Sequence, residues 1–544
     1  MAVLSKLLSF PNLTLAAIPE SLLAIKLFPD YYGSQSHIAA VATILLANYA
    51  FGILFWALLY PVLFSPLRRI PGPRAYVSAA HRALAVEGRP SGDLFLDIVE
   101  KYPGEDLVSL NALRNQILVT NPRLLADVLV HRCYDFSKPK RISSFLRHIL
   151  GDGLIIVEGD QHKFLRKNTT PAFHFRHIKN LYPMMWNKAE TLTRTLNEDI
   201  TNTGSHTIEL SPWASKVTLD IIGIAGLGRK FDAVEKKQDP LAGIYEELLE
   251  PDREKLIFSM MALALGLPFV RLIPWKMNDL FNHLTGSLNK ICRPMIQEKK
   301  IAITEKEDDH FDVLSLLMRS TNFSDEALKD QLLTFLAAGH ETTASALTWA
   351  CYLLTKHPEI QQKLRDEINE ALPQDVENDP TIDLAGVLEP LPYLNGIMHE
   401  TLRLYPTVPL TMRQALCDTQ IGDQFIPEGT DIIISIWYIH RSPQIWGPDA
   451  AEFRPERWIT EDGKPNQNGG ASSNYDFETF LHGPRSCIGQ GFAKAEMRCL
   501  LAAMVRAFSW TLAMDDALVL PRGVITIKPE NGLYLKLTPL PPST

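Results

Sequence analysis

Cysteine and excess positive charge are both scarce in this sequence. Its 544 residues include six cysteines, and no two of them form a CxxC pair. A disulfide scaffold or a cysteine-rich zinc site is therefore disfavoured, and a reducing compartment is favoured. The formal net charge is −8, so the sequence lacks the basic excess that is typical of nucleic-acid-binding proteins.

Two common catalytic patterns are also missing. The His-Glu pairs at residues 340 and 399 each begin an HExxH pattern, but Ala344 and Arg403 stand where a zinc protease needs its second histidine. The glycines at 223–228 and 489–491 resemble nucleotide-binding glycines only loosely, without a clear strand–glycine–helix setting. Neither class of enzyme is supported.

Charged residues are absent from Ile38 to Phe64. About 20 apolar residues cross a bilayer core, so this run predicts a transmembrane helix. Arg68 and Arg69 follow it and predict that the downstream chain faces the cytosol. A cleaved signal peptide fits poorly, because the run lies beyond the usual N-terminal window. A buried core helix is the other alternative.

Four segments follow from this pattern. We expect an apolar N-terminal segment over residues 1–37, a transmembrane helix over 38–64, a proline-rich hinge over 65–74 and one folded domain over 75–544. In the first segment, Pro11 and Pro19 interrupt the apolar stretch. The sequence leaves open whether this stretch lies in the interface, re-enters or spans the membrane.

The body of the chain is predicted to be mainly helical, because a periodicity of 3.6 residues dominates from about Leu94 onward. Short β-like runs interrupt it at residues 107–110, 116–119, 432–436 and 524–527. The acidic stretch 305–310 and the Gly/Ser/Asn-rich stretch 466–474 are predicted loops.

One long helix is well defined by the sequence. Ser324 is its expected N-cap, and apolar periodicity continues to Leu354. A glycine inside a helix costs about 1 kcal/mol, so Gly339 is tolerable where another group approaches the backbone. The Thr342 hydroxyl is one turn from the Ala338 carbonyl and can bond it. A core helix with chance polar residues is the alternative.

The most specific pattern lies near the C-terminus. From Phe480 to Gly489 the sequence is FLHGPRSCIG, and its Cys487 precedes a helix predicted over residues 491–508. A helix N-terminus favours a thiolate there. The forked donors of Arg485 suit a carboxylate.

This string resembles the haem-binding signature of the cytochrome P450 family, FxxGxRxCxG, at every fixed position. AGHETT at 338–343 resembles the family's oxygen-activation motif, ETLR at 400–403 its ExxR motif, and FRPERW at 453–458 its PERF-like motif. All four occur in the family's order, and the resemblance covers about residues 70–537. The N-terminal anchor resembles that of microsomal members, and the sequence as a whole resembles fungal ones.

The resemblance implies a mainly α cytochrome P450 fold, which is a large helical domain with small β-sheets, preceded by a transmembrane anchor. It implies haem b as cofactor and Cys487 as the iron ligand. Further implied haem contacts are Arg485, Arg166, His162, Arg413, Phe480 and Gly339. His162 replaces the tryptophan of the family's WxxxR helix, which makes that contact a departure from the pattern. Glu400, Arg403 and Arg457 are implied to form a buried ionic cluster.

The implied activity is that of a monooxygenase. Glu341 and Thr342 would pass protons to oxygen bound at the haem, and a cysteine thiolate favours O–O cleavage. Electrons would come from NADPH through NADPH–cytochrome P450 reductase, with cytochrome b5 as an optional second donor. Docking lysines would be Lys163, Lys167 and Lys494, and the catalytic domain would face the cytosol from the endoplasmic reticulum membrane.

The sequence does not identify the substrate. By family position, apolar pocket residues would be Phe335, Ala338, Val408, Pro409, Leu410 and Met412. The fungal resemblance favours tailoring of a secondary metabolite. The alternatives are a fatty-acid or xenobiotic hydroxylase, a non-oxygenating haem sensor or electron carrier, and a reductase-independent isomerase or dehydratase of the same fold.

Overall fold

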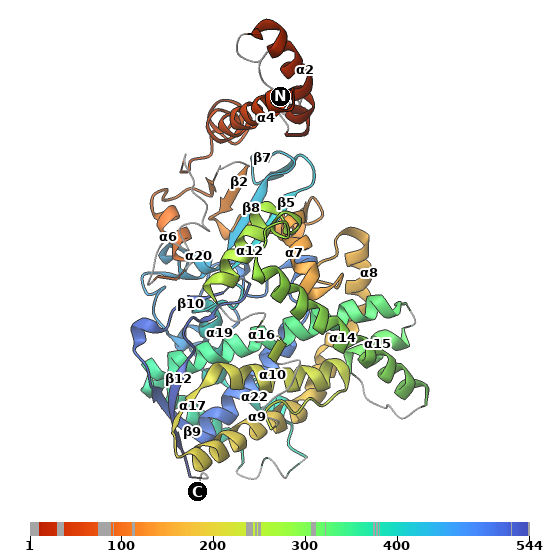
Figure 1. Cartoon of the computed structure of the whole chain (residues 1–544). Coiled ribbons are helices and arrows are strands. Elements are labelled where there is room, and N and C mark those ends of the chain that lie inside the picture. Colours follow the sequence, from red (N-terminus) through yellow and green to blue (C-terminus); the bar gives the residue numbers. More distant parts are fainter. Residues whose placement is uncertain are drawn as a thin grey trace.

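Helices make up most of the molecule, which is described by a computed structural model (Figure 1). The structure describes residues 10–29, 37–73, 89–90, 92–110, 115–235, 243–244, 247, 252–305, 312–320, 322–373, 376, 379, 381–523 and 525–541. The N-terminal helices project from one end of the body, and the C-terminus lies at the opposite end (Figure 1). The predicted mainly α architecture is confirmed.

The α-helices of the described residues vary from one turn to 32 residues. They are α2 (Phe10–Leu27), α4 (His37–Leu54), α6 (Asp93–Glu100), α7 (Lys140–Leu150), α8 (Gly159–Thr169), α9 (Phe175–Thr203), α10 (Leu210–Leu227), α12 (Arg253–Leu265), α13 (Leu267–Val270), α14 (Lys276–Thr304), α15 (Val313–Arg319), α16 (Asp325–Lys356), α17 (Pro358–Ala371), α18 (Leu384–Leu388), α19 (Pro392–Leu404), α20 (Ile436–Arg441), α21 (Pro443–Trp446) and α22 (Gln490–Ala507). Two π-helical segments are η1 (Phe55–Phe64) and η3 (Asp127–His131). The 3₁₀ turns are η2 (Pro122–Leu124), η4 (Thr170–Phe173), η5 (Pro455–Trp458), η6 (Asn474–Asp476), η7 (Gly483–Arg485) and η8 (Asp516–Leu518).

The described strands are short and form small sheets. A five-stranded sheet has the order β1-β2-β8-β5-β3, in which β2 and β8 run parallel and the other pairs antiparallel. Three smaller sheets are β4-β12-β9, β6-β7 and β10-β11. The strands are β1 (Leu107–Ser109), β2 (Gln116–Val119), β3 (Phe136–Ser137), β4 (Thr207–Glu209), β5 (Leu410–Ala415), β6 (Thr419–Ile421), β7 (Gln424–Ile426), β8 (Asp431–Ser435), β9 (Phe508–Leu512), β10 (Pro521–Arg522), β11 (Lys528–Pro529) and β12 (Tyr534–Pro539).

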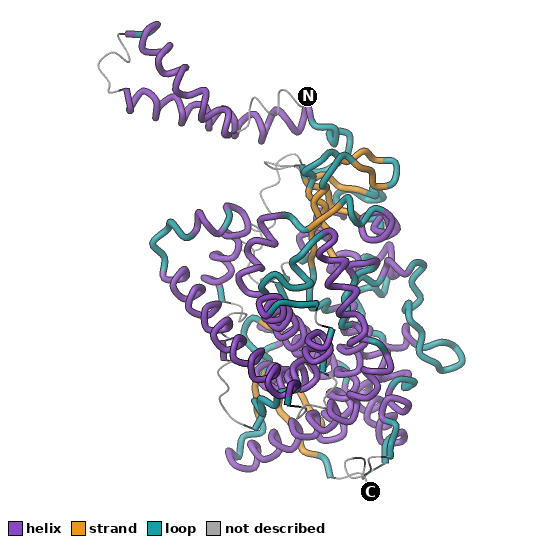
Figure 2. The backbone as a smooth tube through the Cα atoms, turned by 90° about the vertical axis from the view of Figure 1, so that its right-hand side faces the viewer, coloured by secondary structure: helices purple, strands orange, loops and turns teal. Residues whose placement is uncertain are grey.

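Helix α16 lies in the middle of the body (Figure 1), which Figure 2 shows from the side as mostly helix, in purple, with short strands in orange. It begins as predicted, because the Ser324 side chain accepts a hydrogen bond from the Ala327 N–H at 3.2 Å. Its apolar residues join one large core with those of α9, α10, α19 and α22. A chain segment packed on all sides in this way holds its polar side chains in fixed positions.

The N-terminal helices form a pair of their own. Helix α4 continues directly into η1, so residues 37–64 are helical throughout, and α2 packs beside α4. The Asn48 amide donates to the Glu20 carboxylate at 2.5 Å and to the Leu13 carbonyl at 3.3 Å, and the Thr14 and Tyr49 hydroxyls lie 2.7 Å apart. Of the described helices, α4 is the one that is long and apolar enough to cross a membrane.

Most of the predicted elements are confirmed, and one strand is wrong. The strands near residues 107, 116 and 432 and the helix after Cys487 are present, the last as α22. The strand expected over 524–527 is absent: residue 524 lies outside the described residues, and 525–527 form a bend before β11. The Ile527 carbonyl bonds to side chains of α16 and not to a neighbouring strand. Of the predicted acidic loop, residues 306–310 also lie outside the described part.

Candidate functional site

The loop before α22 presents the Cys487 thiol. The Cys487 N–H donates to the Phe480 carbonyl at 2.8 Å, which closes the loop. Gly483 has a φ of +76°, and a Cβ there would lie 2.0 Å from the Leu129 carbonyl oxygen, so this position requires glycine. A Cβ at Gly489 would lie 4.0 Å from the Cys487 sulfur, so the backbone passes close beside the thiol. The sequence pattern therefore corresponds to a tightly constrained loop.

The Cys487 thiol is accessible, although the surrounding protein desolvates it. This desolvation raises the pKa of Cys487, while the Gly489 N–H and the nearby Arg166 lower it in part. The helix N-terminus was predicted to favour the thiolate, but in the protein alone burial outweighs that effect. Binding of a metal ion displaces the proton of a coordinating thiol.

Helix α8 places two predicted residues beside this loop. Arg166 donates to the Ser486 carbonyl at 2.6 Å, one residue before Cys487. His162 is 3% exposed, and its Nδ1 has no hydrogen-bond partner among the described residues. Burial, together with Arg485 and Lys138, lowers the pKa of His162 to about 4. The ring is therefore neutral near pH 7 and retains one N–H to donate.

Arg485, Arg413 and Lys138 approach the same place from three other segments. The Glu158 carboxylate forms ion pairs with Arg485, at 2.7 Å, and with the Lys138 ammonium, at 3.6 Å. Arg413 is buried and donates to neutral oxygens, at 3.1 Å to Thr411 and 2.9 Å to its neighbour's carbonyl. Burial lowers the pKa of Arg413 to about 10 and that of Lys138 to about 8. Lys138 and Glu158 belong to no motif, so the sequence did not predict their place in the site.

We call Lys138, His162, Arg166, Arg413 and Arg485 the basic cluster. Among the described residues, Glu158 is the carboxylate within ion-pair distance of the cluster, and the cations Lys138, Arg166, Arg413 and Arg485 outnumber it. Burial raises the pKa of Glu478, the other carboxyl near Arg413, which favours its neutral form. Buried charge without sufficient countercharge is costly, and a bound anion offsets that cost. A haem carries two carboxylates on one edge and an iron that accepts a thiolate. The donor set of the basic cluster and Cys487 therefore fits a haem group.

Helix α16 has a short, partly exposed patch in an otherwise buried stretch. From residue 331 to 354, all of which are described, every residue is buried except Ala338, Gly339 and Thr342. The Thr342 hydroxyl donates to the Ala338 carbonyl at 2.8 Å, as predicted. A Cβ at Gly339 would lie 2.7 Å from Ile222 of α10, so close helix packing accounts for this glycine. Its predicted contact with haem stays a prediction.

An aromatic contact links α16 to the cysteine loop. Phe173, in η4, lies 4.0 Å from a Cβ built at Gly489, and its ring centroid is 5.8 Å from that of Phe335 in α16. The half-buried Ala338 lies one turn after Phe335 on the same helix. Phe335 and Ala338 of the predicted pocket are therefore linked to the cysteine loop through Phe173. Of the other predicted pocket residues, Val408 and Pro409 precede β5, and Leu410 and Met412 belong to it.

The Glu341 carboxylate is buried, next in sequence to the half-exposed Thr342. Its Oε1 lies 2.6 Å from the Lys528 ammonium and accepts from the Thr526 hydroxyl at 3.4 Å. The His340 ring lies 3.7 Å from the other carboxylate oxygen. Burial lowers the pKa of His340, which favours the neutral ring. The ion pair with Lys528 was missed, because no sequence motif connects these two residues.

The predicted ionic cluster around Glu400 is confirmed. Arg403 donates to both carboxylate oxygens, at 2.7 and 2.8 Å, and Arg457 donates at 3.1 Å. Trp458 adds a further donor at 2.8 Å, which the motif did not indicate. Arg403 also donates to the carbonyls of His440 and Ala450, so the cluster ties α19 to the segment that leads to the cysteine loop.

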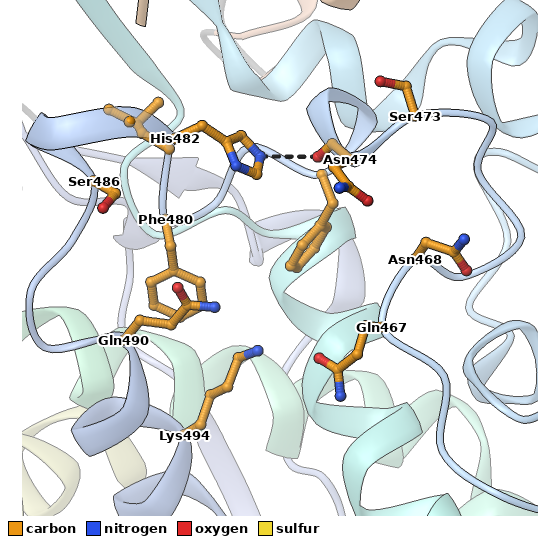
Figure 3. Close-up of a pocket in the computed structure, with 12 residues that line it drawn as sticks. Gln467, Asn468, Ser473, Asn474, Phe480, His482, Ser486, Gln490 and Lys494 are labelled. Carbon is orange, nitrogen blue, oxygen red and sulfur yellow. Dashed lines mark hydrogen bonds between the residues drawn. The ribbon is translucent and has the colours of Figure 1, made fainter. Parts of the chain in front are cut away.

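A polar pocket of about 280 Å³ lies against the outer side of the cysteine loop (Figure 3). Lys494 and Gln490 line it from α22, and the His482 ring and the Asn474 carbonyl are joined by a 2.8 Å contact. Burial and the neighbouring Arg498 lower the pKa of Lys494 to about 8. The other lysines predicted for docking, Lys163 and Lys167, are exposed on α8, and Lys163 pairs with Asp160 at 2.8 Å.

Comparison with known proteins identifies relatives over nearly the whole chain. A family model described as Cytochrome P450 matches residues 94–536. The cytochrome P450 monooxygenase sphH of Aspergillus fumigatus is 39% identical over 520 residues, which cover 94% of each chain. The cytochrome P450 monooxygenase ALT8 of Alternaria alternata is 34% identical over 96% of this chain and 99% of its own. The cytochrome P450 monooxygenase FUM15 of Gibberella moniliformis is 35% identical over 89% and 90%.

Proposed function

The chain belongs to the cytochrome P450 family and is a monooxygenase, and on that premise we propose that Cys487 binds the haem iron while the basic cluster binds the haem carboxylates. One observation carries this assignment: an accessible thiol adjoins a set of buried cations that the protein itself leaves under-compensated. Cys133, Cys292, Cys351 and Cys499 are buried, and Cys417 is in no haem-loop motif.

The bound haem supplies the oxygen chemistry, and this chain's residues orient and protonate around it. Arg166 and Arg485, which lie on and beside the cysteine loop, would bind the haem carboxylates. Thr342, on the half-exposed side of α16, holds a proton at its hydroxyl, and Glu341 replenishes that proton from the interior. In this proposal α16 supplies the protons, and the cysteine loop supplies the Cys487 thiolate as iron ligand.

We propose that the substrate is an apolar fungal secondary metabolite that this enzyme tailors by adding one oxygen atom. The relatives described above are monooxygenases of fungi, and the pocket residues expected on α16 and around the start of β5 are apolar. A hydrophobic pocket with few polar groups selects such molecules. Thr342 in the partly exposed patch of α16 favours oxygenation over the non-oxygenating alternatives, which need no proton relay.

The family implies a reductase as redox partner, and we propose that it is the NADPH-dependent one, with cytochrome b5 as an optional second donor. Lys163 and Lys167 are exposed, and Lys494 lines the pocket of Figure 3 on the cysteine side. Positive side chains on this side would attract an acidic partner and shorten the electron path to the iron.

We propose that the α2–α4 pair anchors the enzyme in the endoplasmic reticulum membrane, with the catalytic domain in the cytosol. A glutamate in a bilayer needs a polar partner, and Asn48 of α4 provides one for Glu20. Although α4 is the one described helix that is long and apolar enough to cross by itself, this pairing would let α2 insert beside it as a hairpin, which keeps the N-terminus cytosolic. Asn12, in an Asn-Leu-Thr acceptor sequence, is then not glycosylated; a glycosylated Asn12 would show that α4 alone crosses.

Metabolite comparison of strains with and without the gene tests the proposed function. The deletion strain should accumulate an apolar compound that lacks one oxygen atom relative to the product of the parent strain. Complementation with the wild-type gene should restore the product, and complementation with Cys487→Ser should not. Identical metabolite profiles in the parent and the deletion strain would contradict the proposal.

A further inference from the structure

Residues 526–528, which we call the C-terminal strap, dock on the middle of α16. The Ile527 carbonyl accepts from the Ser345 hydroxyl at 2.6 Å and from the Trp349 indole at 3.1 Å. The Ile527 N–H donates to the Thr407 carbonyl at 3.0 Å. The strap therefore joins α16 to the segment that leads into β5, and these bonds satisfy the N–H and the carbonyl of Ile527.

The strap also provides the charged partner of Glu341. Lys528 lies 2.6 Å from the carboxylate, with the Thr526 hydroxyl beside the same oxygen. Both members of the pair are buried, at 8% and 2% exposure. His340 is the third group that faces the carboxylate, and burial disfavours its charged form. Lys528 is therefore the cation that compensates Glu341.

The location of this pair connects it to the reaction. Glu341 immediately precedes Thr342, which is one of the three half-exposed residues in the central part of α16. We propose that Lys528 is a positioning residue: its 2.6 Å ion pair holds the Glu341 carboxylate in place next to Thr342, so that the C-terminal strap sets the geometry of the proton supply at α16. This inference rests on the proposed function and assigns a role to a residue outside the family's motifs.

The consequence of losing Lys528 follows from its burial. A buried carboxylate without a countercharge moves toward water and out of its fixed position. Glu341 would then no longer replenish the Thr342 hydroxyl efficiently. Product formed per NADPH should fall about tenfold, which is less than the roughly 10²-fold or more that a direct acid–base group contributes, because Lys528 acts only by positioning Glu341, and peroxide should rise in its place.

A double-mutant cycle in the full-length, haem-loaded enzyme tests the proposal. Its variants are Lys528→Met, Glu341→Gln and both together, with Lys528→Arg as the charge-conserving variant and Lys536→Met as the matched control. Lys536 is exposed on β12, a strand close by in the sequence. The substrate is the compound isolated from the deletion strain, and product and peroxide are measured per NADPH.

Lys528→Met should lower the product yield about tenfold, while Lys528→Arg and Lys536→Met should stay within about threefold of the wild type. In the Glu341→Gln background, Lys528→Met should cause no further loss, because Lys528 acts through Glu341. Equal losses in both backgrounds, or no loss in the wild-type background, would overturn the proposal. If Lys528→Met alone loses haem, the charge-free double variant should regain it; a double variant without haem would overturn the proposal as well.

A second readout is independent of turnover. Hydrogen exchange of the strap amides in the haem-loaded protein should accelerate in Lys528→Met and in Glu341→Gln, and no further in the double variant. If the wild-type enzyme forms no oxygenated product, the proposed function fails. Hydrogen exchange would still measure the coupling between Lys528 and Glu341. Exchange that changes additively in the double variant would contradict the coupling.

Discussion

Replacement of Glu400 by glutamine is the most informative perturbation of the fold around the site. The carboxylate accepts two hydrogen bonds from Arg403, one each from Arg457 and Trp458, and one from the Arg454 N–H at 3.1 Å. Glutamine keeps the shape, but it removes the negative charge and places an N–H₂ group where donors already converge. Arg403 is 0% exposed, so its charge cannot turn to water.

Breaking a buried ion pair by removing one partner costs about 3–5 kcal/mol, and we expect Glu400→Gln to fall in this range. The matched control is Asp462→Asn, which removes an exposed ion pair with Lys464 and should cost less than about 1 kcal/mol. Urea unfolding of the haem-loaded protein, followed by far-UV circular dichroism, measures both free energies. Equal costs for the two variants would refute the reasoning that burial gives the Glu400 cluster its importance.

Three further predictions follow from single contacts. Thr342→Val should keep haem content and substrate binding but divert electrons from product to peroxide, with a loss of about 10²-fold or less; an unchanged product yield per NADPH would exclude Thr342 from the proton supply. Burial lowers the pKa of His440 to about 3, so between about pH 6.5 and pH 3 the unfolded chain binds a proton that the folded protein does not. As the pH is lowered through this range, the free energy of unfolding should fall by up to about 1.4 kcal/mol per pH unit. His440→Gln should remove one proton from this dependence, and an identical slope in urea unfolding would contradict the assignment. Gly483→Ala places a methyl group 2.0 Å from the Leu129 carbonyl oxygen and should abolish haem incorporation, whereas an alanine at the open Gly463 turn should strain only its own backbone and leave the haem spectrum intact.

The sequence predicted those parts of the site that lie on short, local patterns. The N-cap of α16, the Thr342–Ala338 hydrogen bond and the cysteine loop each depend on residues only a few positions apart. The Glu400 cluster joins distant segments, and it was predictable because the family resemblance supplied the link. In each case, the spacing of the residues in the sequence was sufficient to predict the contact.

Contacts between distant segments without a motif were not predictable. Lys528 pairs with Glu341 although 187 positions separate them (528 − 341), and Lys138 and Glu158 join the basic cluster from loops with no distinctive pattern. The strand predicted over 524–527 failed for a related reason, because the backbone of Ile527 bonds to α16 and not to a strand. In each case tertiary packing, and not local propensity, determined the partner.

The carbon monoxide difference spectrum of the reduced protein tests the central claim most directly. The account predicts a band at about 450 nm for the wild-type enzyme, which reports a thiolate-ligated haem. Cys292→Ser and Cys351→Ser should keep this band, because both thiols are buried away from the cysteine loop in the helical core. Cys487→Ser should lose it, and a Cys487→Ser protein that still shows the band would contradict the assignment of Cys487 as the iron ligand.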